Sequence, residues 1–292
     1  MQERKRIRIG ISGWTYAPWR GKFYPEGLPH KQELAYAAGV FSSIEVNGTF
    51  YGMQKPATFR RWAQEVPDDF VFAIKAPRYI THIRRLRDIE APLSNFLASG
   101  ILELGEKLGP ILWQFPPSFQ YERERMENFL RLLPSDFSEA MKLARKAEPP
   151  FRHPLTKPAK NLALRHAIEI RHESFAVPEF IDLLRKDNVA LVCADTVEWP
   201  LLMDVTANFV YCRLHGSEKL YASGYDGKAL DRWARRVLTW MKGGEPRRGR
   251  RASPKKPRHC AHRDVFVYFD NSMKICAPRD AQSLQDKIRK KA

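Results

Sequence analysis

Eight short segments rich in β-branched and aromatic residues recur along the chain, and most of them end in polar residues. They lie at residues 7–13, 42–47, 70–76, 109–115, 164–172, 190–195, 209–216 and 264–271. Apolar residues recur at helical spacing between them, at residues 30–38, 58–64, 94–108, 122–133, 178–186, 230–241 and 281–289. This alternation predicts a single α/β domain with a (β/α)8 TIM-type barrel. Active sites of such barrels lie where the strands end.

An open doubly wound sheet is the competing fold for alternating strands and helices. Such a sheet normally carries a glycine-rich phosphate-binding fingerprint after an early strand. Here Gly10-Ile11-Ser12-Gly13 is followed by Trp14, and no Walker-type phosphate loop occurs. The 292 residues suit one barrel. We therefore predict one domain over residues 1–292, with an irregular stretch at 146–160 and a mobile basic insert at 245–263.

The net charge of +17 is partly local, because residues 245–263 hold eight Lys and Arg side chains against Glu245 alone. Such a surface attracts phosphates through counterion release. An anionic small molecule or a nucleic acid is therefore an expected partner. A surface that only aids solubility explains the charge equally well, since charge argues for association and not for fold.

Neither the charged start nor the cysteines indicate export. No run of about 18 apolar residues is present, so no membrane association is expected. The charged start shows no apolar signal region. The four cysteines form no CxxC pair, and Cys193 and Cys212 fall within predicted strands, where a thiol packs as a small apolar side chain. We predict a cytoplasmic protein; its oligomeric state stays open.

Polar side chains at the strand ends are the candidates for the site. Alternate strand residues of a barrel point inward, and the last inward layer faces the mouth. A single ion there is better explained as half of a buried pair. For the whole set that explanation fails, because a mouth with only a structural role could be apolar on most strands. The set expected to converge on one cavity is Glu45, Asn47, Lys75, Gln114, Glu169, Arg171, Asp195, Arg213, His215, Asp270 and Asn271.

Further candidates come from the loops that follow the strands. The loop at residues 216–225 follows the seventh predicted strand, and such loops often hold phosphate in this fold. Aromatic side chains after the first two predicted strands could stack on a ring or base, namely Trp14, Tyr16, Trp19, Phe50 and Tyr51. For Trp19 and Phe50 we expect instead that they plug the top of the barrel. The residues assigned to substrate binding are Trp14, Asn47, Thr49, Tyr51, Lys75, His82, Gln114, Arg171, Arg213 and Asn271.

Many separate motifs also occur in a recognisable order. They include IGISGW at residues 9–14, IEVNGTFY at 44–51, FAIKA at 72–76, LGPILWQFPP at 108–117, EIRH at 169–172 and YCRLHG at 211–216. Together they resemble the YecE-like family, a domain of unknown function (number 72). The resemblance implies a TIM barrel and brings no established reaction. The chain departs from it at Gly48, at Asp270 and in the basic insert.

Three kinds of reaction known on this fold are poorly supported by the residues at the strand ends. Retaining glycosidases on this fold commonly place carboxylates after the fourth and seventh strands, but Gln114 and Arg213 stand there. Schiff-base chemistry needs a lysine with a depressed pKa. Lys75 is the strand candidate, and we expect Glu45 or Glu169 nearby to keep it charged. No nucleotide-binding or metal-thiolate motif supports redox chemistry.

The main hypothesis is therefore a hydrolase or lyase that acts on a phosphate-containing or other anionic substrate, such as a nucleotide or nucleic acid. The basic side chains would stabilise developing charge. The catalytic candidates are Glu45, Glu169 and Asp195 as general bases and His215 as an acid near neutral pH.

Two alternatives stay open. Mg, Mn or Zn could be held by Glu45, Glu169, Asp195, Asp270 and His215, because carboxylates and imidazole suit these ions. No short spacing motif such as HExxH supports that cofactor. The second alternative is a non-catalytic module that binds an anion or nucleic acid.

Overall fold

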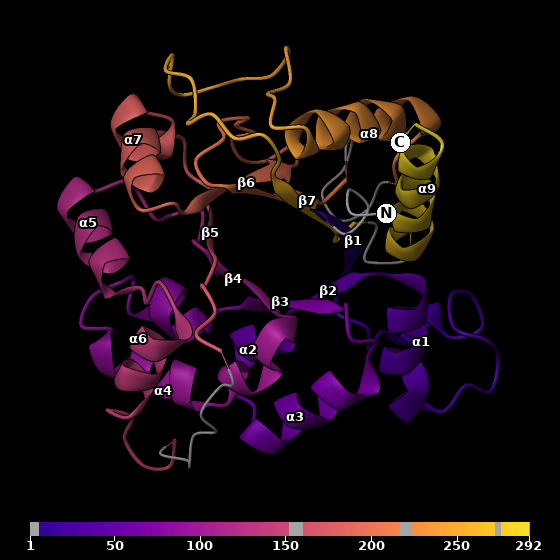
Figure 1. Cartoon of the computed structure of the whole chain (residues 1–292), viewed down its shortest axis with the longest axis horizontal. Coiled ribbons are helices and arrows are strands. Elements are labelled where there is room, and N and C mark those ends of the chain that lie inside the picture. The colour runs from indigo at the N-terminus through magenta and orange to yellow at the C-terminus, as the bar shows by residue number, and fades with distance from the viewer. Residues whose placement is uncertain (1–5, 152–159, 217–223, 272–275, 292) are drawn as a thin grey trace.

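The computed structural model describes residues 6–151, 160–216, 224–271 and 276–291. Its strands run parallel, pair in chain order and close between β1 and β8. Figure 1 shows this ring of strands with helices around it. The predicted (β/α)8 barrel is confirmed. The strands are β1 (Ile7–Ser12), β2 (Ser43–Val46), β3 (Val71–Lys75), β4 (Leu108–Gln114), β5 (His166–Glu169), β6 (Ala190–Asp195), β7 (Phe209–Leu214) and β8 (Asp264–Phe269).

The α-helices cover the outside of the barrel, except for the short α2 (Gly48–Tyr51), which lies at the mouth beside Lys75. They are α1 (Glu33–Val40), α2 (Gly48–Tyr51), α3 (Pro56–Glu65), α4 (Glu90–Ala98), α5 (Arg123–Leu132), α6 (Phe137–Ala144), α7 (Pro178–Lys186), α8 (Gly227–Met241) and α9 (Ala277–Arg289). The helix α7 has the predicted bounds, with proline in its first turn. The described helices include none with the length and apolar character that a membrane span requires.

The prediction of one helix over residues 94–108 is wrong. The helix α4 ends at Ala98, and a separate 3-10 helix, η5 (Ile101–Lys107), follows. Between them Gly100 takes a φ of 109°, which L side chains rarely adopt, and a Cβ on it would lie 2.4 Å from the Pro56 Cα. The close approach of α3 therefore requires glycine here, and this glycine ends the helix.

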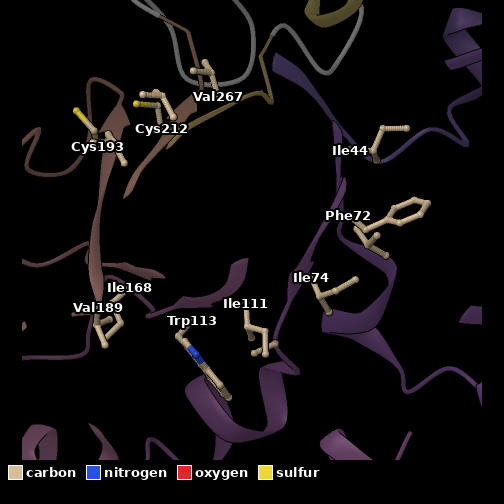
Figure 2. Packing of buried hydrophobic residues seen from close by; sticks show 14 of the residues in the cluster. Ile44, Phe72, Ile74, Ile111, Trp113, Ile168, Val189, Cys193, Cys212 and Val267 are labelled. Carbon is tan, nitrogen blue, oxygen red and sulfur yellow. The ribbon is translucent and has the colours of Figure 1, made fainter. Parts of the chain in front are cut away.

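Both faces of the strands are buried. Outward side chains such as Ile44, Phe72 and Trp113 pack in the layer between the barrel and the helices (Figure 2). Cys193 and Cys212 are buried as free thiols in the same layer, as predicted for cysteines within strands. Parallel strands covered on both faces read as nearly continuous apolar runs.

Inward side chains fill the barrel in layers. Tyr211, Phe266 and Tyr268 lie together inside it, with the rings of Tyr211 and Phe266 stacked at 6.5 Å. The next inward residue after Tyr211 on β7 is Arg213, so the aromatic layer forms an apolar floor beneath polar strand ends. The barrel interior is thus a packed core closed below the mouth.

The basic segment at residues 245–263 contains no helix or strand in the structure. It is attached to the connection between β6 and β7, because the Asp204 carboxylate accepts hydrogen bonds from the backbone amides of Ala252 (2.8 Å) and Ser253 (3.1 Å). In the predicted irregular stretch at 146–160, residues 152–159 lie outside the described part of the chain.

Candidate functional site

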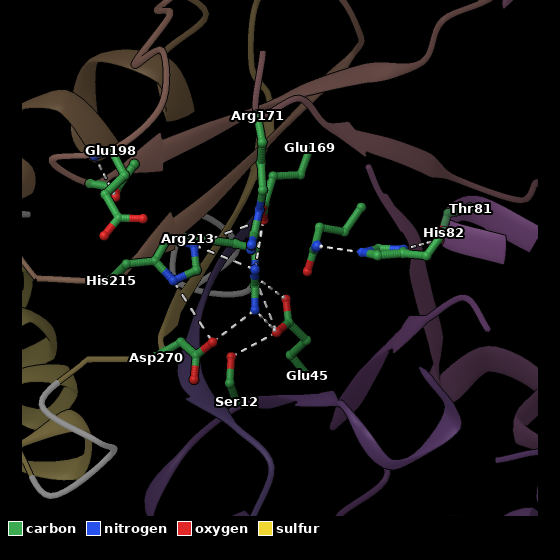
Figure 3. Close-up of polar contacts among 12 residues, drawn as sticks. Ser12, Glu45, Thr81, His82, Glu169, Arg171, Glu198, Arg213, His215 and Asp270 are labelled. Carbon is green, nitrogen blue, oxygen red and sulfur yellow. Dashed lines mark hydrogen bonds and ion pairs between the residues drawn. The ribbon is translucent and has the colours of Figure 1, made fainter. Parts of the chain in front are cut away.

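Polar side chains at the ends of most strands meet inside the barrel. Glu45 ends the inward row of β2, Lys75 that of β3, Glu169 that of β5 and Arg213 that of β7, while Asp270 directly follows β8. Register places Ser12 beside Glu45 and Gln114 beside Glu169. All of these side chains are buried. Figure 3 shows Ser12, Glu45, Glu169, Arg213 and Asp270 converging from different strands.

Arg213 is the centre of this cluster. Its guanidinium donates from Nη2 to Glu45 Oε1 at 2.9 Å and from Nε to Glu45 Oε2 at 3.0 Å. Its Nη1 donates to Glu169 Oε2 at 2.6 Å, and Nη2 also donates to Asp270 Oδ2 at 3.0 Å (Figure 3). The side chain of Arg213 is 1% exposed. One buried cation therefore binds three carboxylates, and each ion pair is shielded from water.

Glu45 and Glu169 are each held by further donors. Ser12 Oγ donates to Glu45 Oε1 at 2.7 Å, and Tyr211 Oη donates to Glu45 Oε2 at 2.6 Å. Arg171 Nε donates to Glu169 Oε1 at 2.7 Å. Burial by itself raises the pKa of Glu169, but the two arginines outweigh burial and hold that pKa well below its usual value. Glu169 is therefore a fixed anion and a weak base.

The Trp199 ring packs against Arg171 and orients its guanidinium. The guanidinium carbon lies 4.0 Å from the centre of the Trp199 ring, a cation–π contact. The same ring packs edge-on against His215, with ring centres 5.6 Å apart. Trp199 therefore fixes two side chains of the mouth at once. It comes from the connection between β6 and β7.

His215 is fully buried among charged groups. Its Nε2 lies 3.9 Å from Glu169 Oε2, and its Nδ1 lies 3.8 Å from Asp270 Oδ2. Burial lowers the pKa of His215, and the charge of Arg213 lowers it further, against the opposing carboxylates. The imidazole is thus mainly uncharged at neutral pH, which disagrees with the predicted role of an acid near neutral pH.

Lys75 differs from the other ions of the mouth. Its side chain is only 8% exposed, and its amine forms no hydrogen bond or ion pair with any described residue. The Nζ lies 4.2 Å from the centre of the Phe50 ring. Burial lowers the pKa of Lys75 to about 7, and Arg213 adds to this against Glu169 and Glu45. The two carboxylates raise the pKa of Lys75 but do not offset burial and Arg213, so the expectation that they keep Lys75 charged holds only below about pH 7.

His82 lies on the same side of the mouth as Lys75. Its Nδ1 lies 2.8 Å from Thr81 Oγ1 (Figure 3). Its ring packs edge-on against Phe50 at 5.0 Å, and its Nε2 lies 3.3 Å from Gln114 Nε2. Burial lowers the pKa of His82 to about 4, with Lys75 as the next cause. A neutral imidazole therefore stands beside the amine.

A cavity of about 300 Å³ opens between the loops after β1 and β2. Ser12, Trp14 and Asn47 are among its walls, and Ser12 links it to the cluster through Glu45. The Asn47 Oδ1 is buried and has no hydrogen-bond partner among the described residues. An acceptor of this kind is costly to leave unpaired, so a ligand donor at this position would be stabilised.

The full sequence matches the profile of a family described as protein of unknown function DUF72, over residues 8–292. The chain belongs to the DUF72 family. Its predicted resemblance to YecE-like proteins is confirmed, since it is 30% identical to UPF0759 protein YecE of Escherichia coli over 133 residues, 45% of this chain and 46% of that protein. UPF0759 protein YunF of Bacillus subtilis is 28% identical over 125 residues, 41% of this chain and 43% of that protein. The aligned part thus spans under half of these relatives.

Two solved structures of DUF72 family proteins share the fold. The one from Thermotoga maritima superposes with a TM-score of 0.70 at 22% identity, covering 98% of this chain and 99% of that chain. The one from Enterococcus faecalis superposes with a TM-score of 0.68 at 18% identity, covering 97% and 95%. The barrel is therefore shared across the family at low sequence identity.

Several predicted site residues of this DUF72 protein lie apart from the mouth cluster. Asp195 accepts a hydrogen bond from Trp233 Nε1 of α8 at 2.9 Å, and Asn271 donates to Asp280 of α9 at 2.8 Å. Both residues follow neighbours that face the barrel interior, Ala194 and Asp270, so alternation turns them toward the helices. Tyr51 is 75% exposed. Thr49 binds main-chain carbonyls, including that of Lys75 at 2.7 Å, and so positions the end of β3.

A divalent metal site is one of the alternatives that the sequence leaves open. Among the described residues no group of three His, Cys, Asp or Glu side chains is placed to hold a metal ion. The reason is Arg213, which occupies the space between Glu45, Glu169 and Asp270. Of the predicted loop at 216–225, residues 217–223 lie outside the described part of the chain.

Three contributors to the site were not predicted from the sequence. They are Ser12, Trp199 and Tyr211, which bind Glu45 or cover Arg171. Tyr211 has the same parity on β7 as Arg213, so strand alternation could have placed it inward. Trp199 lies in an irregular connection, and only its place in a polar stretch, between Glu198 and Pro200, marks it.

Proposed function

We propose that this DUF72 protein is a lyase-type enzyme that binds a small anionic carbonyl compound at the barrel mouth and forms an imine with Lys75. The supporting observation is that the carboxylates of the mouth are paired with a cation, whereas among the described residues the Lys75 amine is not paired with a carboxylate. The carboxylates of Glu45, Glu169 and Asp270 are all bound to Arg213, whereas the Lys75 amine is buried without a partner among the described residues. A desolvated lysine is the usual nucleophile for a carbonyl substrate.

The chemistry needs the amine, the substrate and a group that exchanges protons. The neutral Lys75 amine adds to the carbonyl carbon to form a carbinolamine, which loses water to give an imine. Once protonated, the imine withdraws electrons, so a C–H or C–C bond at the neighbouring carbon can break: the electron pair stays in an enamine, and a proton or an electrophilic carbon fragment leaves. Protonation of the enamine and hydrolysis of the imine by water then release the product and restore the Lys75 amine. A pKa of about 7 leaves a large neutral fraction of Lys75 at neutral pH. His82 is uncharged there and can exchange protons beside Phe50.

The same cluster argues against the predicted hydrolase with a glutamate base. A general base works best when its pKa lies near the working pH. Arg213 and Arg171 hold the pKa of Glu169 well below its usual value. Glu45 accepts hydrogen bonds from Ser12, Tyr211 and Arg213. Neither carboxylate is placed to take a proton from water.

The substrate is expected to carry a carboxylate or phosphate. Arg171 is 12% exposed at its side chain and keeps its guanidinium plane against Trp199. A planar guanidinium held in this way binds an oxyanion with little loss of side-chain entropy. Protonated Lys75 would add a second cation to a substrate arriving at lower pH.

Reductive trapping tests the proposal. The protein is incubated at pH 7 with glyoxylate, the smallest oxo acid, and sodium cyanoborohydride, which reduces an imine to a stable secondary amine. Peptide mass mapping should then find the carboxymethyl group on Lys75 before exposed lysines. The Lys75→Arg variant should lose this fast labelling, while Lys242→Arg, altered at an exposed lysine, should keep it. Equal labelling of surface lysines with Lys75 unmodified would reject the imine mechanism.

A non-catalytic anion-binding module is the second candidate function, favoured by the complete pairing of the mouth carboxylates. A ligand that binds only the folded state raises the melting temperature. If glyoxylate or inorganic phosphate raises the melting temperature of wild type and no amine is trapped at Lys75, the mouth binds anions without this chemistry.

A further inference from the structure

A second cavity lies at the opposite end of the barrel from Lys75. Its volume is about 910 Å³, and its walls come from α7, residues 205–208 and the basic segment at 255–263. Asn208 immediately precedes β7, and Arg263 immediately precedes β8. The cavity therefore lies at the amino ends of the strands, where the segment after α8 runs outside β6 toward α7 (Figure 1). We call it the basal cavity.

The walls of the basal cavity are strongly cationic. Arg185, Lys186, Lys255, Arg258 and Arg263 line it, and the one carboxylate among its described walls is Asp182. That carboxylate is already bound by Lys255 at 2.6 Å and lies 3.9 Å from Arg185 Nη1. The remaining positive charge has no counterion in the cavity wall, so the cavity has an attractive potential for anions.

Two arginines are fixed in place with donors left over. Arg185 Nε donates to the Val205 carbonyl at 3.2 Å and its Nη1 to Ser253 Oγ at 3.4 Å, but its buried Nη2 has no partner among the described residues. Arg263 is 1% exposed and donates to the carbonyls of Gly244 and Arg258, while its Nε has no described partner. Burial lowers the pKa of Arg263. Unpaired donors on buried cations are unfavourable unless an acceptor arrives.

The residue types that line the basal cavity favour a phosphate compound over single-stranded nucleic acid. Rigid arginine forks and lysines together suit phosphate oxygens. Single-stranded nucleic acid normally needs aromatic side chains on which bases stack. The described residues of this wall include no Phe, Tyr or Trp. A concave site also fits a compact ligand better than an extended backbone.

We propose that the basal cavity is a binding site for a compact, multiply charged phosphate compound, held by Arg185, Lys186 and Arg258. The amino-terminal face of a barrel normally serves stability and not catalysis. Occupancy of this site would therefore act on stability through the segment at 245–263, which Asp204 ties to the barrel. The site is independent of the proposed chemistry at Lys75.

Titration calorimetry with inorganic tripolyphosphate tests this site on the full chain. We expect saturable binding to wild type and at least tenfold weaker binding to the double variant Lys186→Gln/Arg258→Gln. The control Arg232→Gln/Arg235→Gln removes the same charge from the exposed surface of α8 and should keep the wild-type affinity. Asp182→Asn, which removes the carboxylate, should bind tripolyphosphate more tightly.

Three results would overturn the proposal. If wild type does not bind tripolyphosphate, the basal cavity is not a phosphate site. If the two double variants lose affinity equally, the binding comes from the net positive charge of the protein and not from this cavity. A 20-nucleotide RNA that displaces tripolyphosphate, and whose binding both double variants weaken alike, would show a nucleic-acid surface instead. Glyoxylate trapping at Lys75 should be unchanged in Lys186→Gln/Arg258→Gln, so failure at one end of the barrel is distinguishable from failure at the other.

Discussion

Arg213 and Glu45 form a two-pronged ion pair across the barrel, at 2.9 and 3.0 Å, although 168 positions separate them in the chain. The pair joins β7 to β2, which are not neighbours in the sheet. Tyr211, one layer below on β7, donates to the same carboxylate. The pair thus cross-links the barrel directly above its aromatic floor.

Replacing Arg213 by Met should be strongly destabilising. Three buried carboxylates would lose their shared cation, and removing one partner of a buried pair costs about 3–5 kcal/mol. Urea unfolding followed by circular dichroism measures the change. Arg61→Ala serves as the control, since that side chain is 66% exposed and pairs with Glu65 at 3.4 Å, a contact worth at most about 1 kcal/mol. Similar small losses in both variants would contradict this account of the cluster.

Gly10→Ala should also destabilise the barrel. Gly10 lies opposite Ser43 where β1 and β2 pair, and a Cβ on Gly10 would lie 1.7 Å from the Ser43 carbonyl oxygen. Both strands must shift to admit it, which we expect to cost about 3 kcal/mol or more. Gly39→Ala is the matched control, because a Cβ there meets nothing within 4 Å in α1 and a helical Ala gains up to about 1 kcal/mol. In urea unfolding we expect Gly10→Ala to lower the free energy of unfolding and Gly39→Ala to raise it.

The place of the site could be predicted from the sequence, because polar residues end strands whose other residues are apolar. Glu45, Lys75, Glu169 and Arg213 do meet at the mouth. The direction of Asp195 could not be predicted, since β6 is apolar on both faces and its alternation carries no signal. Its contact with Trp233 appears only when α8 is packed against the strand.

The protonation state of Lys75 could not be predicted from the sequence either. Whether Lys75 is charged depends on what Glu45 and Glu169 bind, and Arg213 reaches them from the far side of the barrel. Sequence spacing places these residues at one mouth but does not pair them. Trp199, which stacks on Arg171, comes from an irregular connection that periodicity cannot place.

The pH dependence of stability should reveal the depressed pKa of Lys75. Its pKa is about 7 in the folded protein and 10.5 when unperturbed, so between these values the unfolded chain binds more protons. Stability due to Lys75 therefore rises with pH from about 7 to 10.5, by up to about 1.4 kcal/mol per pH unit, and is lost as pH falls through 7. Lys75→Met should be more stable than wild type at pH 6, and this advantage should shrink by pH 9. A constant difference in urea unfolding across that range would show that Lys75 has an ordinary pKa.

The pKa of His82 should report the charge of Lys75. Burial and Lys75 lower the pKa of His82 to about 4, so the wild-type ring should stay neutral down to about pH 5 in nitrogen-15 NMR. Lys75→Met removes the second of these causes and should raise the pKa of His82. His166 is a matched control: burial lowers its pKa to about 4 as well, but its ring bonds to the Pro134 carbonyl and to Trp113, away from Lys75. If both histidines shift alike, the variant has loosened the whole barrel; if neither shifts, the amine does not act on His82.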